Sequence, residues 1–308
     1  MYRKIMGFLE AWKENEHRKP LILQGARQVG KTYSILEFGR THYENVAYFN
    51  FETNPKLNET FEENISPDYL IPILSHIAGQ TIVKEKTLIV FDEVQLCERA
   101  LTSLKYFCED APDYHIIVAG SLLGVAVNRA KFSFPVGKVD MKTLYPMDME
   151  EFMLALGEDD LVEQIKKCFQ TDTPLPSALH DAAMQLYRQY LVVGGMPECV
   201  MQFAETKDYI LVRHTQDTIL ASYLNDMSKY NSLNEIKKTR LAYDNITVQL
   251  SKKNTRFQYK LIKKGGRASE FENAIEWLCL SGIVSQVYKV EQIKKPLENY
   301  RDIDAFKI

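Results

Sequence analysis

The stretch GARQVGKT, from Gly25 to Thr32, restricts the possible folds of this chain more than any other feature. It fits the pattern G-x-x-x-x-G-K-[ST], and it follows the apolar run Leu21-Ile22-Leu23, as the motif requires. Such loops fold tightly at their glycines, so that backbone N–H groups and the start of the next helix surround phosphate oxygens. The sequence therefore predicts a nucleotide phosphate site made of Gly25, Ala26, Arg27, Gln28, Val29, Gly30, Lys31, Thr32 and Tyr33.

A second stretch, TLIVFDE, supplies the carboxylates that such a site needs. Asp92 and Glu93 lie at the end of the most apolar run in the chain, where ligands bind in open parallel sheets. We expect Lys31 to reach the β- and γ-phosphates of ATP, and Thr32 and Asp92 to hold Mg²⁺. Glu93 is then placed to orient or deprotonate an attacking water, which favours a hydrolase over a kinase.

The stretch HIIVAGS ends in Ser121, directly after a strand-like run. Its hydroxyl could contact the γ-phosphate as a sensor, and it could equally be an ordinary turn or cap residue. We keep Ser121 as a catalytic candidate beside Glu93 and Lys31.

The order of the apolar patterns predicts an α/β chain with three parts. Strand-like runs alternate with helical patterns in the first half, which is typical of a parallel sheet covered by helices. The strands are expected at 20–24, 45–52, 87–92, 115–119 and 139–144. Helical patterns then dominate as far as Tyr230, interrupted at VVGGMPE. The chain closes with a helix at 236–251, a short apolar stretch, a second helix and a strand at 283–290, the order of a winged helix. We predict a P-loop domain at 1–147, a helical lid at 148–230 and a winged helix domain at 231–308.

Charge is distributed unevenly along the chain. Residues 1–228 hold 22 lysines and arginines against 32 aspartates and glutamates, whereas residues 229–308 hold 16 against 9. A basic winged helix usually binds DNA. A solvated surface whose lysines merely face the acidic half of the chain would show the same charge pattern. The candidate partner-binding residues are Lys252, Lys253, Arg256, Lys260, Lys263, Lys264 and Arg267.

The last helical pattern limits how DNA could be bound. Its apolar positions, Phe271, Ala274, Ile275 and Leu278, share one face, so Glu270, Glu272 and Glu276 should face outward. Carboxylates on the helix that would enter the major groove oppose base contacts. The sequence therefore predicts binding through phosphates, with weak sequence preference and steep salt dependence.

Taken together, GARQVGKT, LIVFDEVQ, VAGS, LYPMDMEEF and GGMPE resemble the AAA+ type ATPases whose second half is a domain of unknown function numbered 4143. The stretch RFQYKLIKKGGRASEFENAIEWLCLSGIV is similar to the same bacterial and archaeal family. The resemblance implies a sheet of strand order 5-1-4-3-2, a helical lid and a winged helix. It also implies a chain that continues past Ile308, so we expect a fragment, without nuclease chemistry from Asp302 and Asp304.

The resemblance also suggests roles for residues outside the two main motifs. In related ATPases a G-x-P motif in the lid contacts the nucleotide, and Gly195 and Pro197 match it here, although any turn between helices uses the same residues. Relatives often carry a Gly-Arg pair whose arginine could act on a neighbouring site. This chain has Lys138 in PVGKV, with Arg129 the nearest alternative. Lysine lacks the planar guanidinium of arginine, which stabilises a transferring phosphoryl group. Activation of ATP hydrolysis by a neighbouring subunit of a ring is therefore in question.

The leading hypothesis is a slow Mg-ATPase switch whose nucleotide state alters the grip of the winged helix on DNA or on a protein partner. Two alternatives stay open: an interaction module that ATP only stabilises, and a small-molecule kinase.

The five cysteines form no C-x-x-C pair, which argues against a disulfide framework and a zinc site. No apolar run approaches the roughly 18 residues of a membrane span, so we expect a cytoplasmic protein without membrane contact that could form oligomers.

Overall fold

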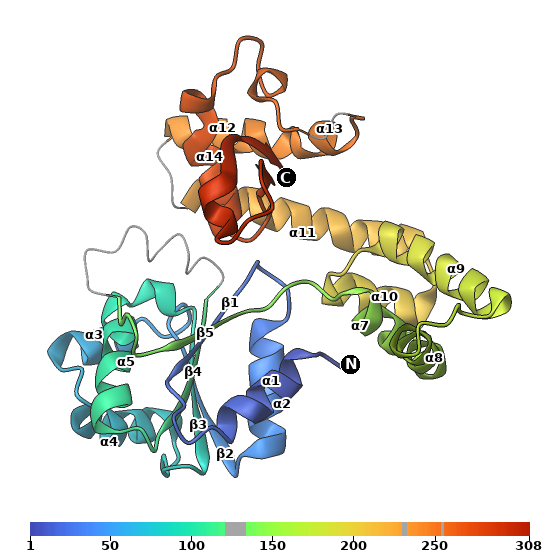
Figure 1. The fold of residues 1–308 in the computed structure, drawn as a ribbon. Helices are drawn as coiled ribbons and strands as arrows, with labels where there is room; N and C mark the ends of the chain where they lie inside the picture. The colour runs from blue at the N-terminus through green and yellow to red at the C-terminus, as the bar shows by residue number, and fades with distance from the viewer. Residues whose placement is uncertain (121–133, 230–232, 254–255) are drawn as a thin grey trace. The chain divides into compact units, whose positions relative to one another are not determined.

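The chain forms two compact units in a computed structural model, Met1–Thr218 and Ile219–Ile308. One helix, α11 (Tyr209–Lys229), begins in the first unit and ends in the second (Figure 1). The structure describes residues 1–120, 134–229, 233–253 and 256–308.

Five parallel strands form the sheet of the first unit. Their spatial order is β2-β3-β4-β1-β5, which confirms the predicted order 5-1-4-3-2. The central strand β4 and its neighbour β3 are buried along their whole length, which explains their nearly continuous apolar sequences. The bounds are β1 Leu21–Gln24, β2 Asn45–Asn50, β3 Thr87–Asp92, β4 His115–Gly120 and β5 Asp140–Thr143.

Helices cover both faces of this sheet. On one face, α1 (Ile5–Lys13) lies beside α2 (Lys31–His42) (Figure 1). The opposite face carries α3 (Lys56–Glu63), α4 (Pro67–Ala78) and α5 (Glu98–Asp110). The core beneath these three helices includes Phe51, Phe61 and Phe91, whose rings meet at centroid distances of 5.5 to 5.9 Å. Burying a side chain of this size contributes about 1.5–3 kcal/mol, so this cluster firmly anchors the end of β3.

A set of helices follows the sheet within the first unit. The first of them, α7, begins at a capping box, in which the Glu151 N–H donates to the Asp148 carboxylate at 2.9 Å and the Asp148 N–H donates to Glu151 at 3.2 Å. The predicted interruption at VVGGMPE separates α9 from α10, which starts at Pro197. The bounds are α7 Met149–Ala155, α8 Asp159–Gln170, α9 Ser177–Val193 and α10 Pro197–Thr206.

The second unit contains helices and one antiparallel strand pair. The helix predicted at 236–251 is two helices that meet at Asn245, whose side-chain amide donates to the Leu261 carbonyl at 2.9 Å. The predicted inward positions of α14 are confirmed, because Phe271, Ala274, Ile275 and Leu278 are all buried. The final predicted strand is shorter than expected and pairs with a strand that was not predicted. The bounds are α12 Leu233–Asp244, α13 Ile246–Leu250, α14 Ala268–Leu280, β6 Val287–Val290 and β7 Arg301–Lys307. The winged helix assignment stays a prediction.

Within the described residues, no helix is both long enough and apolar enough to cross a bilayer. The five cysteines are free thiols, of which Cys97 and Cys199 are buried. Burial raises the pKa of each of these two thiols to about 11, so neither is a ready nucleophile at neutral pH.

Candidate functional site

The P-loop connects β1 to α2 through a backbone that its two glycines make possible. Gly25 has φ +150°, and a Cβ atom there would lie 2.2 Å from the carbonyl oxygen of Leu144. Gly30, directly before α2, has φ +88°, in the left-handed region where other residues are strained. Gly25 is therefore needed for the close approach to Leu144, and Gly30 is needed for the turn into α2.

Lys31 is almost fully buried inside this loop. Its Nζ donates to the carbonyl oxygens of Gly25 at 2.9 Å and Ala26 at 2.8 Å. Burial lowers the pKa of Lys31 to about 8, and the nearby carboxylates of Glu93 and Asp92 offset part of that effect. At neutral pH the lysine is therefore mostly protonated, and its positive charge is held next to the loop.

Asp92 joins the two sequence motifs at the end of β3. Its Oδ2 accepts a hydrogen bond from the Thr32 hydroxyl at 2.8 Å and another from the Tyr48 hydroxyl at 2.7 Å. Burial raises the pKa of Tyr48 to about 12, so the phenol stays protonated and can donate at physiological pH. Two hydroxyl groups and a carboxylate thus form an oxygen-rich corner beside the P-loop.

Glu93 follows Asp92 in an unusual backbone conformation. Its φ of 52° and ψ of 39° are left-handed, which costs a residue other than glycine roughly 1–2 kcal/mol. Its backbone N–H donates to Asp92 Oδ1 at 3.0 Å, and its carboxylate accepts a hydrogen bond from the Gln95 side chain. Strain of this kind is often found at functional sites, where the surrounding structure maintains it.

These groups meet at a cavity of about 500 Å³ within the first unit. The P-loop contributes Arg27, Gln28, Gly30, Lys31, Thr32 and Tyr33, and β3 and its loop contribute Asp92 and Glu93. Helix α10 contributes Pro197, Glu198 and Met201, and the N-terminal segment contributes Met1 and Arg3. The structure thus brings the predicted residues Lys31, Thr32, Asp92, Glu93 and Pro197 to one cavity.

Gly195 lies next to this cavity and does not line it. A Cβ atom at Gly195 would lie 2.1 Å from the carbonyl oxygen of Met147, and the Met147 N–H donates to the Gly195 carbonyl at 2.6 Å. The Tyr190 hydroxyl donates to that same Met147 oxygen at 2.8 Å. Gly195 therefore permits a close backbone contact that positions the start of α10, and Pro197 is the residue of this pair that lines the cavity.

The other two predicted catalytic residues are Lys138 and Ser121, of which the structure describes only Lys138. Lys138 is absent from the cavity lining, and its Nζ forms an ion pair with Glu109 at 2.8 Å on the surface of the same unit. This ion pair raises the pKa of Lys138. A role for Lys138 within its own chain's cavity therefore has no support in the geometry. Ser121 and Arg129 lie outside the described residues.

The predicted basic residues lie in the second unit, and those named for partner binding are exposed. Lys263 forms an ion pair with Glu270 at 3.2 Å, and Arg256 donates to the Asp304 carbonyl at 3.1 Å. A cavity of about 470 Å³ beside the β6–β7 pair is lined by Arg256 together with Lys289 and Lys307. Sequence reasoning did not include these last two lysines, although they belong to the same basic part of the chain.

The sequence did not predict four residues of the cavity lining, Met1, Arg3, Glu198 and Met201, nor Tyr48, which contacts Asp92 beside it. Tyr48 had a detectable signal, because it alternates with buried residues on β2, the strand paired with β3. Arg3 had none, since it reaches the P-loop from the far N-terminus.

Family models match two parts of the chain. Residues 17–153 match a family model described as an AAA domain, and residues 184–308 match a domain of unknown function, DUF8612. The second model differs from the domain numbered 4143 that the motifs resemble. No curated protein matches the chain.

Two solved structures share the fold. The Walker-type ATPase of Pyrococcus abyssi has 14% identity and a TM-score of 0.58, over 100% of this chain and 93% of that one. The ORC2 protein of Aeropyrum pernix, solved as ADPNP-ADP complexes, has 12% identity and a TM-score of 0.51, over 93% and 88%. The first part of the chain thus has the P-loop fold of these two structures, and it is the part that matches the AAA domain model.

Proposed function

We propose that this chain binds Mg-ATP and hydrolyses it slowly, as a nucleotide-controlled switch of the AAA+ type. The observation that carries the proposal is the hydrogen bond between Thr32 and Asp92, 2.8 Å long, beside a cavity that Lys31 and Glu93 also line. These groups come from two motifs 60 residues apart and correspond to the parts that phosphoryl-transfer sites use. Bound Mg-ATP would supply the metal ion and a phosphoryl group open to attack by water.

The residues present fit Mg²⁺ that arrives with a nucleotide. This ion prefers oxygen ligands and is usually held by one or two side chains together with substrate phosphates and waters. The Thr32 hydroxyl and the Asp92 carboxylate are such oxygens. In the part of the chain that the structure describes, no group of three or more His, Cys, Asp or Glu residues could hold a metal ion. The donor set therefore suits a metal shared between protein and nucleotide.

Five of the cavity residues have distinct parts in this proposal. The Lys31 ammonium binds phosphate oxygens, in exchange for the two loop carbonyls that it contacts here. The Glu93 carboxylate orients the attacking water and accepts its proton. Met1, Pro197 and Met201 provide apolar surface suited to the flat face of a nucleobase.

The position of α10 supports a switch over a passive binding site. A nucleotide in the cavity would contact the P-loop and α10 together, so its loss would change what holds this helix. Helix α11 follows α10 and continues into the second unit, which provides a covalent route for coupling. We propose that this route connects the nucleotide state to the basic second unit.

The activity is tested by measuring inorganic phosphate released from ATP with Mg²⁺ and with excess EDTA. We expect turnover on the order of 1 s⁻¹ or slower with Mg²⁺, and background release with EDTA. Release without phosphorylated product supports hydrolysis. Phosphorylated product without free phosphate would instead identify a kinase, and nucleotide binding without turnover would identify an interaction module.

The proposed partner of the second unit is DNA, contacted through its phosphates, with a protein partner as the other outcome of the test. If about four phosphates are neutralised, affinity for duplex DNA should fall about 100-fold between roughly 50 and 200 mM salt. Replacing Lys252 and Lys253 by glutamine should reduce the slope of log affinity against log salt by about 2. Fluorescence anisotropy with two unrelated duplexes measures both effects.

The matched control for these lysines is Lys86→Gln in the first unit, where Lys86 is exposed and paired with Glu44. This variant should bind DNA like the wild type. Equal binding at low and high salt, or no binding at low salt, would reject DNA and leave a protein as the candidate partner.

A further inference from the structure

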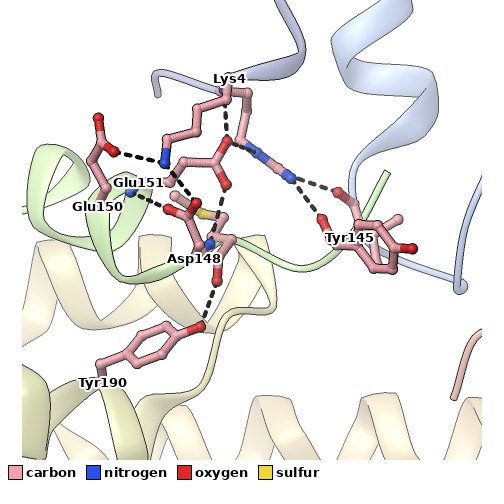
Figure 2. Close-up of polar contacts among 9 residues, drawn as sticks. Lys4, Tyr145, Asp148, Glu150, Glu151 and Tyr190 are labelled. Carbon is pink, nitrogen blue, oxygen red and sulfur yellow. Dashed lines mark hydrogen bonds and ion pairs between the residues drawn. The ribbon is translucent and has the colours of Figure 1, made fainter. Parts of the chain in front are cut away.

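Arg3 connects parts of the first unit that are far apart in sequence. Its guanidinium donates through Nη1 to the carbonyl oxygen of Val29 in the P-loop at 2.9 Å, and through Nη2 to the Tyr145 carbonyl at 2.8 Å. Its Nε donates to Glu151 in α7 at 3.1 Å. Figure 2 labels two of the residues that Arg3 contacts, Tyr145 and Glu151. One buried side chain thus contacts the P-loop, the segment after β5 and the helix that follows it.

The contact with Val29 bears on the phosphate site. In a trans peptide the carbonyl and the following N–H point in opposite directions. Because Arg3 holds the Val29 oxygen, it also fixes the direction of the Gly30 N–H, at the turn that leads into α2. A Cβ atom at Gly30 would lie 3.5 Å from Arg3 Nη1 and 3.6 Å from Pro197 Cγ, so both side chains closely flank this turn.

The contact with Glu151 holds Arg3 in place. Arg3 and Glu151 are each 4% exposed, and the Glu151 carboxylate also accepts from the Lys4 N–H at 2.7 Å and from the Asp148 N–H at 3.2 Å. A buried carboxylate with this many donors is a fixed anchor, because moving it would leave a charge without partners. The position of α7 is thereby connected to the peptide before Gly30.

We propose that Arg3 is a positioning residue for nucleotide phosphates, which keeps the P-loop in its binding conformation while anchored on Glu151. This inference rests on the proposed nucleotide site. Arg3 acts through the Val29–Gly30 peptide and adds to the binding that Lys31 and Thr32 provide directly.

The neighbouring Lys4 offers a matched control. Its Nζ binds Asp148 and Glu150, both at 2.7 Å, so it also ties the N-terminal segment to the start of α7 (Figure 2). Neither acceptor belongs to the P-loop, and the Lys4 side chain is 42% exposed. Variants at Arg3 and Lys4 therefore separate an effect on the P-loop from a general loosening of the N-terminus.

The experiment measures the affinity of Mg-ADP for the full chain by isothermal titration calorimetry, with thermal unfolding as a check on folding. Arg3→Gln should weaken ADP binding about 10-fold or more, since a lost hydrogen bond to a charged group changes affinity by that amount. Lys4→Gln should change it less than about 2-fold. Arg3→Lys should lie between the wild type and Arg3→Gln, because lysine keeps the charge and loses the fork that reaches three acceptors.

A double-mutant cycle adds a readout that a merely structural role would not give. Glu151→Gln should weaken ADP binding in the wild-type background and change it little further in the Arg3→Gln background, because Glu151 acts through Arg3. If the losses of ADP affinity in Glu151→Gln and Arg3→Gln add up in the double variant, Glu151 does not act through Arg3. ADP affinity unchanged in Arg3→Gln, or equal losses in Arg3→Gln and Lys4→Gln, would overturn the inference alone. If Arg3→Gln does not fold, wild-type affinity in Arg3→Lys would overturn it. A wild-type chain that binds no nucleotide would overturn the proposed function and this inference together.

Discussion

Replacing Lys31 by alanine is expected to weaken Mg-ATP binding about 100-fold or more. The ammonium group would make at least two hydrogen bonds to phosphate oxygens, each contributing about 1.5–3 kcal/mol because both partners are charged. The alanine variant keeps the backbone of the loop and loses those contacts. Titration with a fluorescent ATP analogue measures the affinity, and thermal unfolding without nucleotide checks that the variant is folded.

The matched control for this substitution is Lys86→Ala, which removes an exposed lysine of the same unit and should leave affinity unchanged within about 2-fold. The pH dependence of the wild type gives a second check. The pKa of Lys31 is about 8 in the free protein, and bound phosphates would raise it. Binding above pH 8 then requires uptake of a proton, so affinity should fall as pH rises through that value. Equal affinity in wild type and Lys31→Ala would contradict the phosphate site.

The parts of the fold that sequence predicted well depend on local patterns. A buried parallel strand is apolar along its whole length, and this made TLIVFD and HIIVA visible as strands to within one residue. The P-loop was equally visible, because its glycines are required by the backbone that the structure contains at Gly25 and Gly30. The strand order followed from the family resemblance, and the pairing of β1 with β4 and β5 confirms it.

The parts that sequence missed depend on contacts between distant segments. Arg3 and Glu151 are 148 residues apart, and neither has a neighbourhood in sequence that indicates a buried ion pair. Lys138 was selected because it replaces an arginine of relatives, yet its pairing with Glu109 depends on how β5 and α5 are placed. The break at Asn245 in the second unit has the same origin, since it depends on a hydrogen bond to Leu261. Local periodicity contains no information about such partners.

The groups around Asp92 fall between these cases. Asp92 itself was predicted from its position after β3, and its bond to Thr32 follows from the meeting of β1 and β3 ends at one edge of the sheet. Tyr48 donates to the same oxygen from β2, the edge strand. Tyr48 could have been predicted if the pairing of β2 with β3 had been known, because that pairing places Tyr48 near the end of β3. The sheet topology therefore contains information that the motifs alone do not.

Replacing Glu93 by glutamine is expected to slow ATP hydrolysis by about 10² to 10³-fold while ATP still binds. Glutamine has nearly the same shape and cannot accept the proton of the attacking water, and general-base catalysis typically contributes a factor of this size. The affinity for ATP should stay within about 3-fold of the wild type, because Lys31 and Thr32 are unchanged. Phosphate release at saturating ATP gives the rate, and titration gives the affinity.

Glu198→Gln is the matched control, because Glu198 lines the same cavity from α10 and is distant in sequence from the Asp92-Glu93 pair. It removes one carboxylate, as Glu93→Gln does, and so reproduces any general change in the charge of the cavity. We expect its turnover to stay within about 3-fold of the wild type. Equal slowing by both variants would attribute the effect to cavity charge, and full activity in Glu93→Gln would assign the base to another residue. Loss of turnover with retained binding in Glu93→Gln alone would locate the proton transfer at the residue whose left-handed backbone the fold maintains.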